Sequence, residues 1–200
     1  MNSQTLASEG ESSSFNFRKT EYTGSDQMQI NSQVGDVLEV AADVLISTAN
    51  PWLNLSGGVN GAILSAVGPT IQEELHAHLK SQGISAVPAG TVVQSRAGNL
   101  PFNCILHAVA IDPFYDSSIE LVRQTVAAAL DLAIKAGAKT ISTPTLATGY
   151  GPMSIADFGT AVAPLAGAPR FDGLSLTIVV RSETHRSELS KAISAAQAQA

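Results

Sequence analysis

The chain has 200 residues, of which 44% are hydrophobic and 14% charged, and its formal net charge is −6. This length fits a single domain with enough apolar material for a core. The acidic balance argues against broad binding to a nucleic-acid backbone, which needs clustered Lys and Arg.

Targeting and metal binding are also constrained by the sequence. No apolar run approaches the roughly 18 residues that cross a membrane, so we expect no membrane partner. The polar start, MNSQTLASEG, lacks the pattern of a secretion signal, and we expect a cytoplasmic protein. The lone Cys104 excludes an internal disulfide and a cysteine-cluster zinc site. The sequence indicates no metal and no cofactor.

Strands alternate with helices along the chain. Residues 1–26 are rich in Ser, Thr and Glu and predict a mobile tail, and residues 27–200 predict one domain. We expect capping boxes that begin at Thr70 and Ser117, and a helix cap at Ser154. Alternation of this kind predicts an α/β fold whose sheet is mostly parallel, with helices on both faces. Expected strands lie at 28–34, 44–48, 91–94, 104–111, 139–143 and 174–180, and expected helices at 58–67, 70–83, 117–137, 154–164 and 184–198.

A glycine-rich turn joins the second expected strand to the first expected helix. The apolar strand at 44–48 leads into a polar loop and then into Ser56, Gly57 and Gly58. Glycines there let backbone N–H groups approach an anion, and the helix N-terminus adds a favourable dipole. The turn therefore predicts a phosphate cradle, although a helix start that needs only flexible residues would look the same.

A second glycine turn, Thr148-Gly149-Tyr150-Gly151, follows the strand at 139–143. Ligands of parallel α/β sheets bind beyond the carboxyl ends of the strands, where both turns and the loop at 112–116 should meet. Two such turns fit a ligand with two phosphates. Neither matches a dinucleotide-binding GxGxxG or a GxxxxGK[ST] phosphate loop.

Taken together, these motifs resemble the macrodomain family of ADP-ribose-binding modules. The likeness covers roughly residues 28–195. It implies a three-layer α/β/α fold and binding of ADP-ribose or a derivative, such as O-acetyl-ADP-ribose or a mono-ADP-ribosylated protein. The stretches that carry it are Gly35-Asp36-Val37, LISTAN at 45–50, SGGVNGAI at 56–63, HAV at 107–109 and the loop at 144–151.

The resemblance also implies roles for particular residues. Asp36 would accept a hydrogen bond from the adenine amino group, with the Val37 N–H nearby, and Asn50 would bind the distal ribose. Arg181 is a candidate for stacking on adenine, or else a solvated charge. The diphosphate would lie between two sets of residues: Ser56, Gly57, Gly58 and Val59 on one side, and Thr148, Gly149, Tyr150 and Gly151 on the other.

Departures from the family pattern leave the enzymatic activity open. Asn60 stands where hydrolytic members have an aspartate, and an amide cannot take a proton from water. The alternative to binding is an ADP-ribosyl hydrolase in which water attacks at the distal ribose and a substrate phosphate assists. Its candidate catalytic residues are Asn50, Asn60 and Asp112, although an aspartate before Pro113 is also typical of a turn.

Two further hypotheses concern the limits of the site. Gln72-Glu73-Glu74 matches a run found in polymer-degrading relatives, but it falls inside the expected helix at 70–83 and should not reach the site. Ser47, Ser56 and Asn60 are also compatible with an α/β scaffold whose ligand site has been lost.

Overall fold

A computed structural model describes residues 27–199 of the chain. The tail expected at 1–26, and Ala200 at the end of the expected domain, lie outside the described residues.

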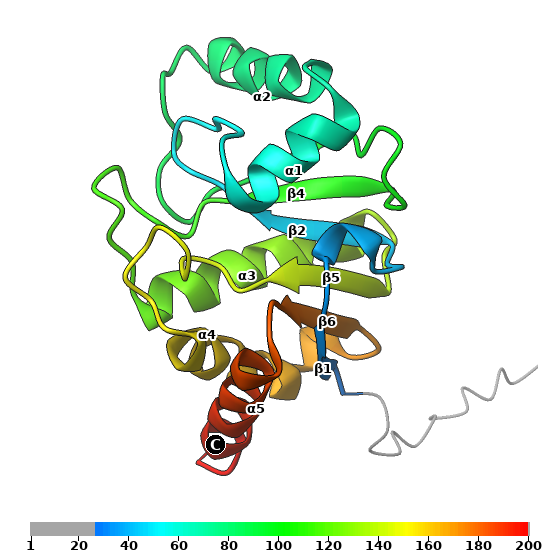
Figure 1. Cartoon of the computed structure of the whole chain (residues 1–200), viewed down its shortest axis with the longest axis vertical. Helices are drawn as coiled ribbons and strands as arrows, with labels where there is room; N and C mark the ends of the chain where they lie inside the picture. The colour runs from blue at the N-terminus through cyan, green and yellow to red at the C-terminus, as the bar shows by residue number, and fades with distance from the viewer. Residues whose placement is uncertain (1–26, 200) are drawn as a thin grey trace, which may run out of the picture.

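The core is a six-stranded sheet in the order β1-β6-β5-β2-β4-β3 (Figure 1). All neighbouring strands are parallel except β3, which runs antiparallel to β4 at one edge. The mixed, mostly parallel sheet predicted from the sequence is therefore confirmed. The strands are β1 (Gln29–Val34), β2 (Val44–Thr48), β3 (Val92–Ser95), β4 (Cys104–Ala108), β5 (Thr140–Pro144) and β6 (Ser175–Val180).

Helices cover both faces of this sheet and complete three layers. Along β2, Ile46 packs into a core with α3 and α4, whereas Leu45 packs with α1 and α2. This alternation follows from the two-residue period of a strand that is buried on both faces. The helices are α1 (Gly58–Val67), α2 (Thr70–Ser81), α3 (Ile119–Lys135), α4 (Ile155–Val162) and α5 (Glu183–Gln197), with 3-10 turns η1 (Val37–Glu39), η2 (Ala163–Gly167) and η3 (Pro169–Phe171).

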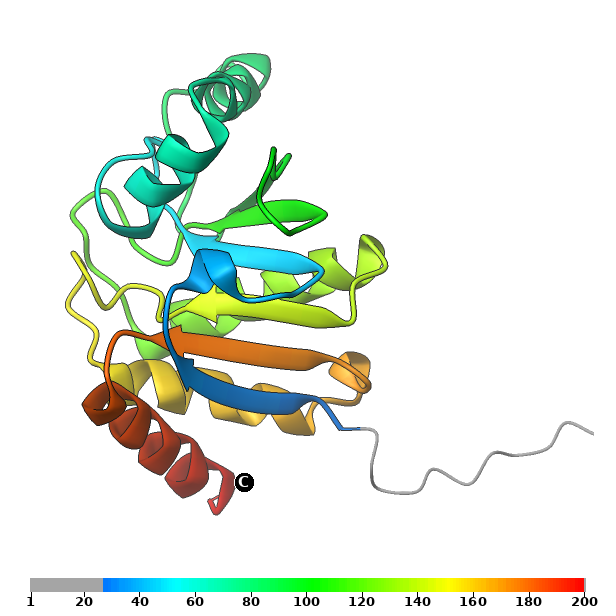
Figure 2. The ribbon, with the colours of Figure 1, turned by 45° about the vertical axis from the view of Figure 1, so that its right-hand side comes forward.

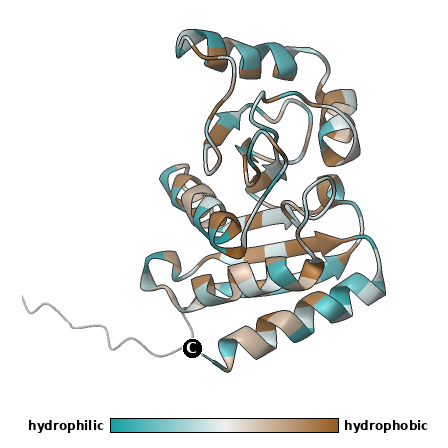
Figure 3. Cartoon of the chain, turned by 90° about the vertical axis from the view of Figure 1, so that its left-hand side faces the viewer, coloured by the Kyte–Doolittle hydropathy of each residue, from teal (hydrophilic) through white to brown (hydrophobic). Residues whose placement is uncertain are grey.

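The views agree on where the helices lie relative to the strands. Helices α1 and α2 lie beyond β2 and β4, and α4 and α5 lie near β6 and β1 (Figures 1 and 2). Figure 3 shows hydrophobic residues along the strands, while the helices carry hydrophobic and hydrophilic residues side by side. The helices thus bury one side and present the other to solvent.

Local capping differs from the expectation at two helices. Thr70 is already helical and Pro69 occupies the cap position without a side-chain bond, so the capping box expected at Thr70 is wrong. Ser118, not Ser117, caps α3 by accepting from the Leu121 N–H, because the Ser117 hydroxyl donates to the Ala110 carbonyl at 2.6 Å.

The cap expected for α4 is found in the structure, whereas β4 is shorter than expected. The cap at Ser154 is confirmed, with a capping box to Asp157. The strand expected to reach residue 111 ends at Ala108, so its expected end is wrong. Its neighbour β2 has ended at Thr48, and the bond from the Ala49 N–H to the Ala108 carbonyl is the last between these two segments.

The two central strands are fastened together at their amino ends. β2 pairs with β5 over Val44–Ile141 and Leu45–Ser142. One Asp43 carboxylate oxygen accepts from the Lys139 N–H (2.9 Å), the Thr140 N–H (2.9 Å) and the Thr140 hydroxyl (2.8 Å). The backbone hydrogen bond from Lys139, followed by those from Thr140, lowers the pKa of the Asp43 carboxyl.

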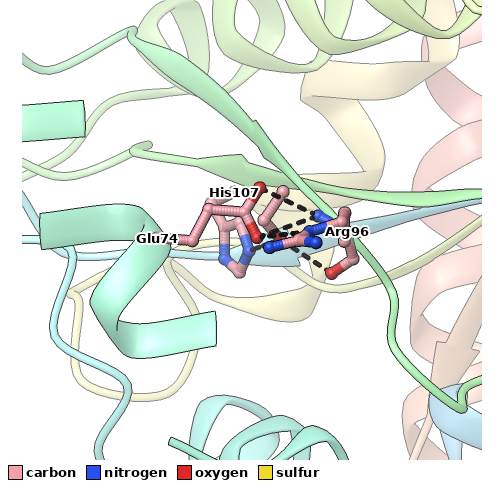
Figure 4. Close-up of polar contacts among 4 residues, drawn as sticks. Glu74, Arg96 and His107 are labelled. Carbon is pink, nitrogen blue, oxygen red and sulfur yellow. Dashed lines mark hydrogen bonds and ion pairs between the residues drawn. The ribbon is translucent and has the colours of Figure 1, made fainter. Parts of the chain in front are cut away.

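A histidine is enclosed where β4 meets β3. His107 is 0% exposed, and its Nε2 lies 2.8 Å from the Ser95 hydroxyl (Figure 4). Its Nδ1 finds no hydrogen-bond partner among residues 27–199. Burial lowers the pKa of His107 to about 4, so the ring is neutral in the folded protein at neutral pH.

This neutral histidine makes the free energy of unfolding depend on pH. The unfolded state binds a proton near a pKa of about 6.5 and the folded state only near about 4, so stability is lost as pH falls between these values. We expect His107 to account for a loss of about 2 kcal/mol between about pH 7 and pH 5.

Urea denaturation at both pH values measures this loss. The variant His107→Gln should lose much less stability on acidification than the parent, whereas the control His78→Gln should behave like the parent. Equal losses in the parent and in His107→Gln would contradict the assignment.

Candidate functional site

A cavity of about 940 Å³ opens at the carboxyl ends of β2, β5 and β6. Both glycine turns line it, together with the segment after β6 and one face of α5. It lies at the sheet edge where the parallel arrangement predicts ligand binding. Its lining comprises residues 48–50, 56–60, 111, 115, 144–145, 147–151, 153–155, 179–181, 185 and 188.

The first turn contributes backbone donors without helical partners to the lining of this cavity. Gly57 and Gly58 both have left-handed φ angles, of 64° and 52°, which favour glycine. Gly57 is the N-cap of α1 and has no side-chain cap, and the first backbone bond to it comes from the Gly61 N–H. The N–H groups of Gly58 and Val59 are therefore free of helical partners and able to bind an anion.

The second turn is folded by its own contacts and reaches the first. The Thr148 hydroxyl donates to the Thr145 carbonyl at 3.0 Å. A Cβ on Gly151 would lie 2.5 Å from the Ala147 carbonyl oxygen, so only glycine fits there. Tyr150 is 78% exposed, and its hydroxyl lies 2.7 Å from the position that a Cβ on Gly57 would take. The two turns thus face each other across a narrow gap.

The two candidate asparagines both line the cavity, and both are engaged in internal bonds. Asn50 accepts from the Asn54 N–H at 3.1 Å and donates to the Asn54 carbonyl at 2.9 Å, which shapes the loop. Asn60 is buried, and its Oδ1 accepts from the Ser47 hydroxyl at 3.2 Å. Each amide keeps a free N–H that can donate to a ligand oxygen.

Three other predicted residues do not line the cavity. One Asp112 oxygen accepts from the Phe114 and Asp116 N–H groups at 2.8 and 2.9 Å, the turn arrangement that the sequence also allowed. Asp36 accepts from the Leu38 N–H at 3.0 Å and caps η1, which includes Val37. Asp36 and Val37 directly follow Gly35, whose N–H donates to the carbonyl of Val180. Val180 itself lines the cavity.

Two lining residues on α5 were missed by the sequence reasoning. His185 and Glu188 lie three residues apart on one helix face, close to the expected Arg181. Among residues 27–199, Glu188 is the one carboxylate that lines the cavity. Their spacing just after β6, at the edge where the other strands end, is the signal that would have located them.

Two residues of the run Gln72-Glu73-Glu74 on α2 bond to other segments of the chain. Glu74 pairs with Arg96, with 3.4 Å between the Arg96 Nε and a carboxylate oxygen (Figure 4). Gln72 does not line the cavity, but its side chain bonds the backbone of the loop before the first glycine turn. Gln72 therefore supports the loop that leads to the site, and none of the three residues lines the cavity.

Within 27–199 no group of three or more His, Cys, Asp or Glu side chains is placed to hold a metal ion. Over that range no helix is long and apolar enough to cross a membrane.

Comparisons with known proteins place this geometry in context. Residues 46–160 match the Macro domain family. An O-acetyl-ADP-ribose deacetylase of Citrobacter koseri is 34% identical over 128 residues, which cover 62% of this chain and 70% of the relative. A deacetylase of the same name from an Enterobacter species is 37% identical over 128 residues, 62% of this chain and 69% of the relative.

Solved structures with the same fold come from a bacterium and a trypanosome. The Oceanobacillus iheyensis macrodomain with ADP superposes with a TM-score of 0.74 at 24% identity, covering 84% of this chain and 92% of that one. The Trypanosoma brucei macrodomain in complex with ADP-ribose gives a TM-score of 0.69 at 19% identity, covering 82% of this chain and 69% of that one. These likenesses confirm the three-layer fold.

The tight contact at Gly151 yields a test of the second turn. Gly151→Ala would push a methyl group against the Ala147 carbonyl, and overpacking of this kind costs about 1–3 kcal/mol. We expect the affinity for ADP-ribose, the ligand implied by the sequence, to fall by about 10-fold or more.

Titration calorimetry measures the change. Gly61→Ala is the matched control, because a Cβ there meets nothing within 4 Å. Unchanged affinity in Gly151→Ala would show that the turn tolerates displacement.

Proposed function

This chain belongs to the macrodomain family, and on that basis we propose that it binds ADP-ribose or an ADP-ribose derivative in the cavity between its two glycine turns. The observation that carries the proposal is the convergence of both turns on one cavity, with the N-terminus of α1 among its walls. The names of the relatives, O-acetyl-ADP-ribose deacetylases and ADP-ribose-bound macrodomains, support the same ligand class.

The chemistry of the walls suits a diphosphate in the middle of the cavity. The donors there are backbone N–H groups at a helix start, which bind anions without adding formal charge. A protein with a net charge of −6 can therefore hold two phosphates without a basic cluster. The N–H groups of Gly58 and Val59 would bind one side of the diphosphate, and the turn at 148–151 would enclose the other.

The two ends of the cavity differ in a way that fits the two ends of ADP-ribose. Asn50 and Asn60 come after β2 and offer amide donors suited to the hydroxyls of the distal ribose. Arg181 follows β6, which β5 separates from β2 in the sheet, and Asp36 and Val37 follow Gly35, which is bonded to Val180. We assign that end to adenosine, with Asp36 accepting from the adenine amino group.

Calorimetry with ADP-ribose, AMP and ADP tests the assignment directly. We expect ADP-ribose to bind more tightly than AMP, because AMP reaches neither the second phosphate position nor Asn50. Asp36→Ala should weaken ADP-ribose binding by about 10-fold, the effect of losing a hydrogen bond to a charged group.

Asp172→Ala is the control, since the Asp172 side chain makes no hydrogen bond or ion pair within 27–199. A folded protein that gives no heat with ADP-ribose would refute the proposed function. An unaffected Asp36→Ala would refute the adenine assignment alone.

A second candidate function is hydrolysis of the bound derivative, and the names of the relatives, which are deacetylases, favour hydrolytic chemistry in general. In a modified protein, water would attack the distal-ribose carbon that carries the protein side chain. The bond to that side chain would break, the side chain would leave, and a ligand phosphate would accept the proton from water. Asn60 is an amide bonded to Ser47, and Asp112 is held in its turn. Neither supplies a base, so turnover should be slow.

Replacing Asn60 tests this activity. Asn60→Asp would supply a carboxylate beside the distal-ribose end, and general-base catalysis is worth about 100-fold or more. We expect its turnover of ADP-ribosylated protein to exceed that of the parent by this factor, as followed by release of ADP-ribose.

Asn60→Ala loses the bond to Ser47 and gains no base, whereas an aspartate keeps an oxygen that accepts from the Ser47 hydroxyl, so Asn60→Ala measures the effect of losing this contact alone. No increase in Asn60→Asp would show that this position does not supply a base here.

A further inference from the structure

The loop between β2 and the first glycine turn depends on bonds from α2. Leu53 has a left-handed φ of 55°, which is strained for a residue with a side chain. Gln72 on α2 donates to the Leu53 carbonyl at 2.9 Å and accepts from the Leu55 N–H at 2.7 Å. One side-chain amide thus hydrogen-bonds the backbone at the strained residue Leu53 and again two residues later, at Leu55.

A second side chain of α2 binds the residue between these two. His76 lies one helical turn after Gln72, on the same face, and its Nε2 is 2.9 Å from Asn54 Oδ1. Because an amide oxygen only accepts, the imidazole is the donor in this bond. We call Gln72 and His76 the α2 clasp.

The α2 clasp connects to the cavity through Asn54. The backbone N–H and carbonyl of Asn54 bind the side-chain amide of Asn50, at 3.1 and 2.9 Å. Leu55, whose N–H is bound to Gln72, directly precedes Ser56 in the first glycine turn. Asn50 and Ser56 line the cavity, whereas Gln72 and His76 do not.

We propose that Gln72 and His76 are positioning residues, which fix Asn50 and the start of the first glycine turn for the distal half of ADP-ribose. The inference rests on the proposed function for its ligand. Ordering a mobile loop at binding costs free energy and therefore weakens affinity, whereas a loop that is already ordered adds no such cost. The clasp supplies that order before the ligand arrives.

Because of its position, the α2 clasp should affect binding of the distal half of the ligand and not of the adenosine half. It supports the loop at 50–56 and contacts neither β6 nor α5, which form the adenosine end. Loss of the clasp should therefore weaken ADP-ribose binding and leave AMP binding almost unchanged. A general loss of structure would weaken both ligands together.

Variants Gln72→Ala and His76→Ala test the proposal in the full chain. We expect ADP-ribose affinity to fall by about 10-fold in each, and AMP affinity to change by less than about 2-fold. The controls are Gln94→Ala, an exposed glutamine on β3, and His78→Ala, whose side chain on α2 makes no hydrogen bond within the described part of the chain. Both should match the parent.

Conservative variants separate the effect of the hydrogen bonds from the effect of side-chain size. Gln72→Glu keeps the size of the side chain and can still accept from the Leu55 N–H, but its second oxygen would face the Leu53 carbonyl, to which Gln72 donates, so its affinity should fall at least as far as that of Gln72→Ala. His76→Gln retains an N–H donor and should recover much of the affinity lost in His76→Ala. Equal ADP-ribose affinity in the parent, Gln72→Ala and His76→Ala would overturn the proposal, as would parallel loss of ADP-ribose and AMP binding.

Hydrogen exchange at the Leu55 amide gives a readout that needs no ligand. This N–H is bonded to Gln72, and its exchange should accelerate in Gln72→Ala and not in Gln94→Ala. If the parent itself fails to bind ADP-ribose, the proposed function falls, and faster exchange then still supports the clasp. Unchanged exchange in Gln72→Ala overturns the clasp whatever the ligand result.

Discussion

The pairing of β2 with β5 is the constraint on which the rest of the site depends. These central strands are joined over two residue pairs, and the Asp43 carboxylate fastens their amino ends through three hydrogen bonds. Their carboxyl ends lead into the two glycine turns, and the cavity lies between them. Parallel pairing of the two strands therefore brings both turns to the same edge of the sheet. The layers of helices on both sides protect this arrangement from water.

Recognition in this cavity relies on the main chain more than on charged side chains. Gly57 and Gly58 adopt left-handed conformations that start α1 with free N–H groups. Asn50 and Asn60 supply neutral amides, each already held by a protein partner. Groups that are held in place before binding need little ordering when a ligand arrives. An acidic protein can therefore be preorganised for an anionic ligand, at a site whose walls include Glu188.

Much of the fold was predictable because it follows from local patterns. The bounds of β2 and α1 are those expected from an apolar run and a helical stripe, and parallel pairing brought both turns to one edge. The sequence failed where a side chain has a choice of partners. Ser117 binds a carbonyl instead of capping α3, and Gln72 crosses to a loop distant in sequence. Such contacts depend on tertiary placement, and no spacing rule encodes them.

The contact between Tyr150 and Gly57 has a consequence for the unliganded state. The phenol hydroxyl lies 2.7 Å from the position that a Cβ on Gly57 would take, so Tyr150 narrows the space between the two turns. A ligand that enters between the turns must therefore fit beside the phenol or displace it. Tyr150 is 78% exposed, and exposed side chains change rotamer within picoseconds to nanoseconds. Displacement of the phenol is therefore fast and does not slow the arrival of the ligand.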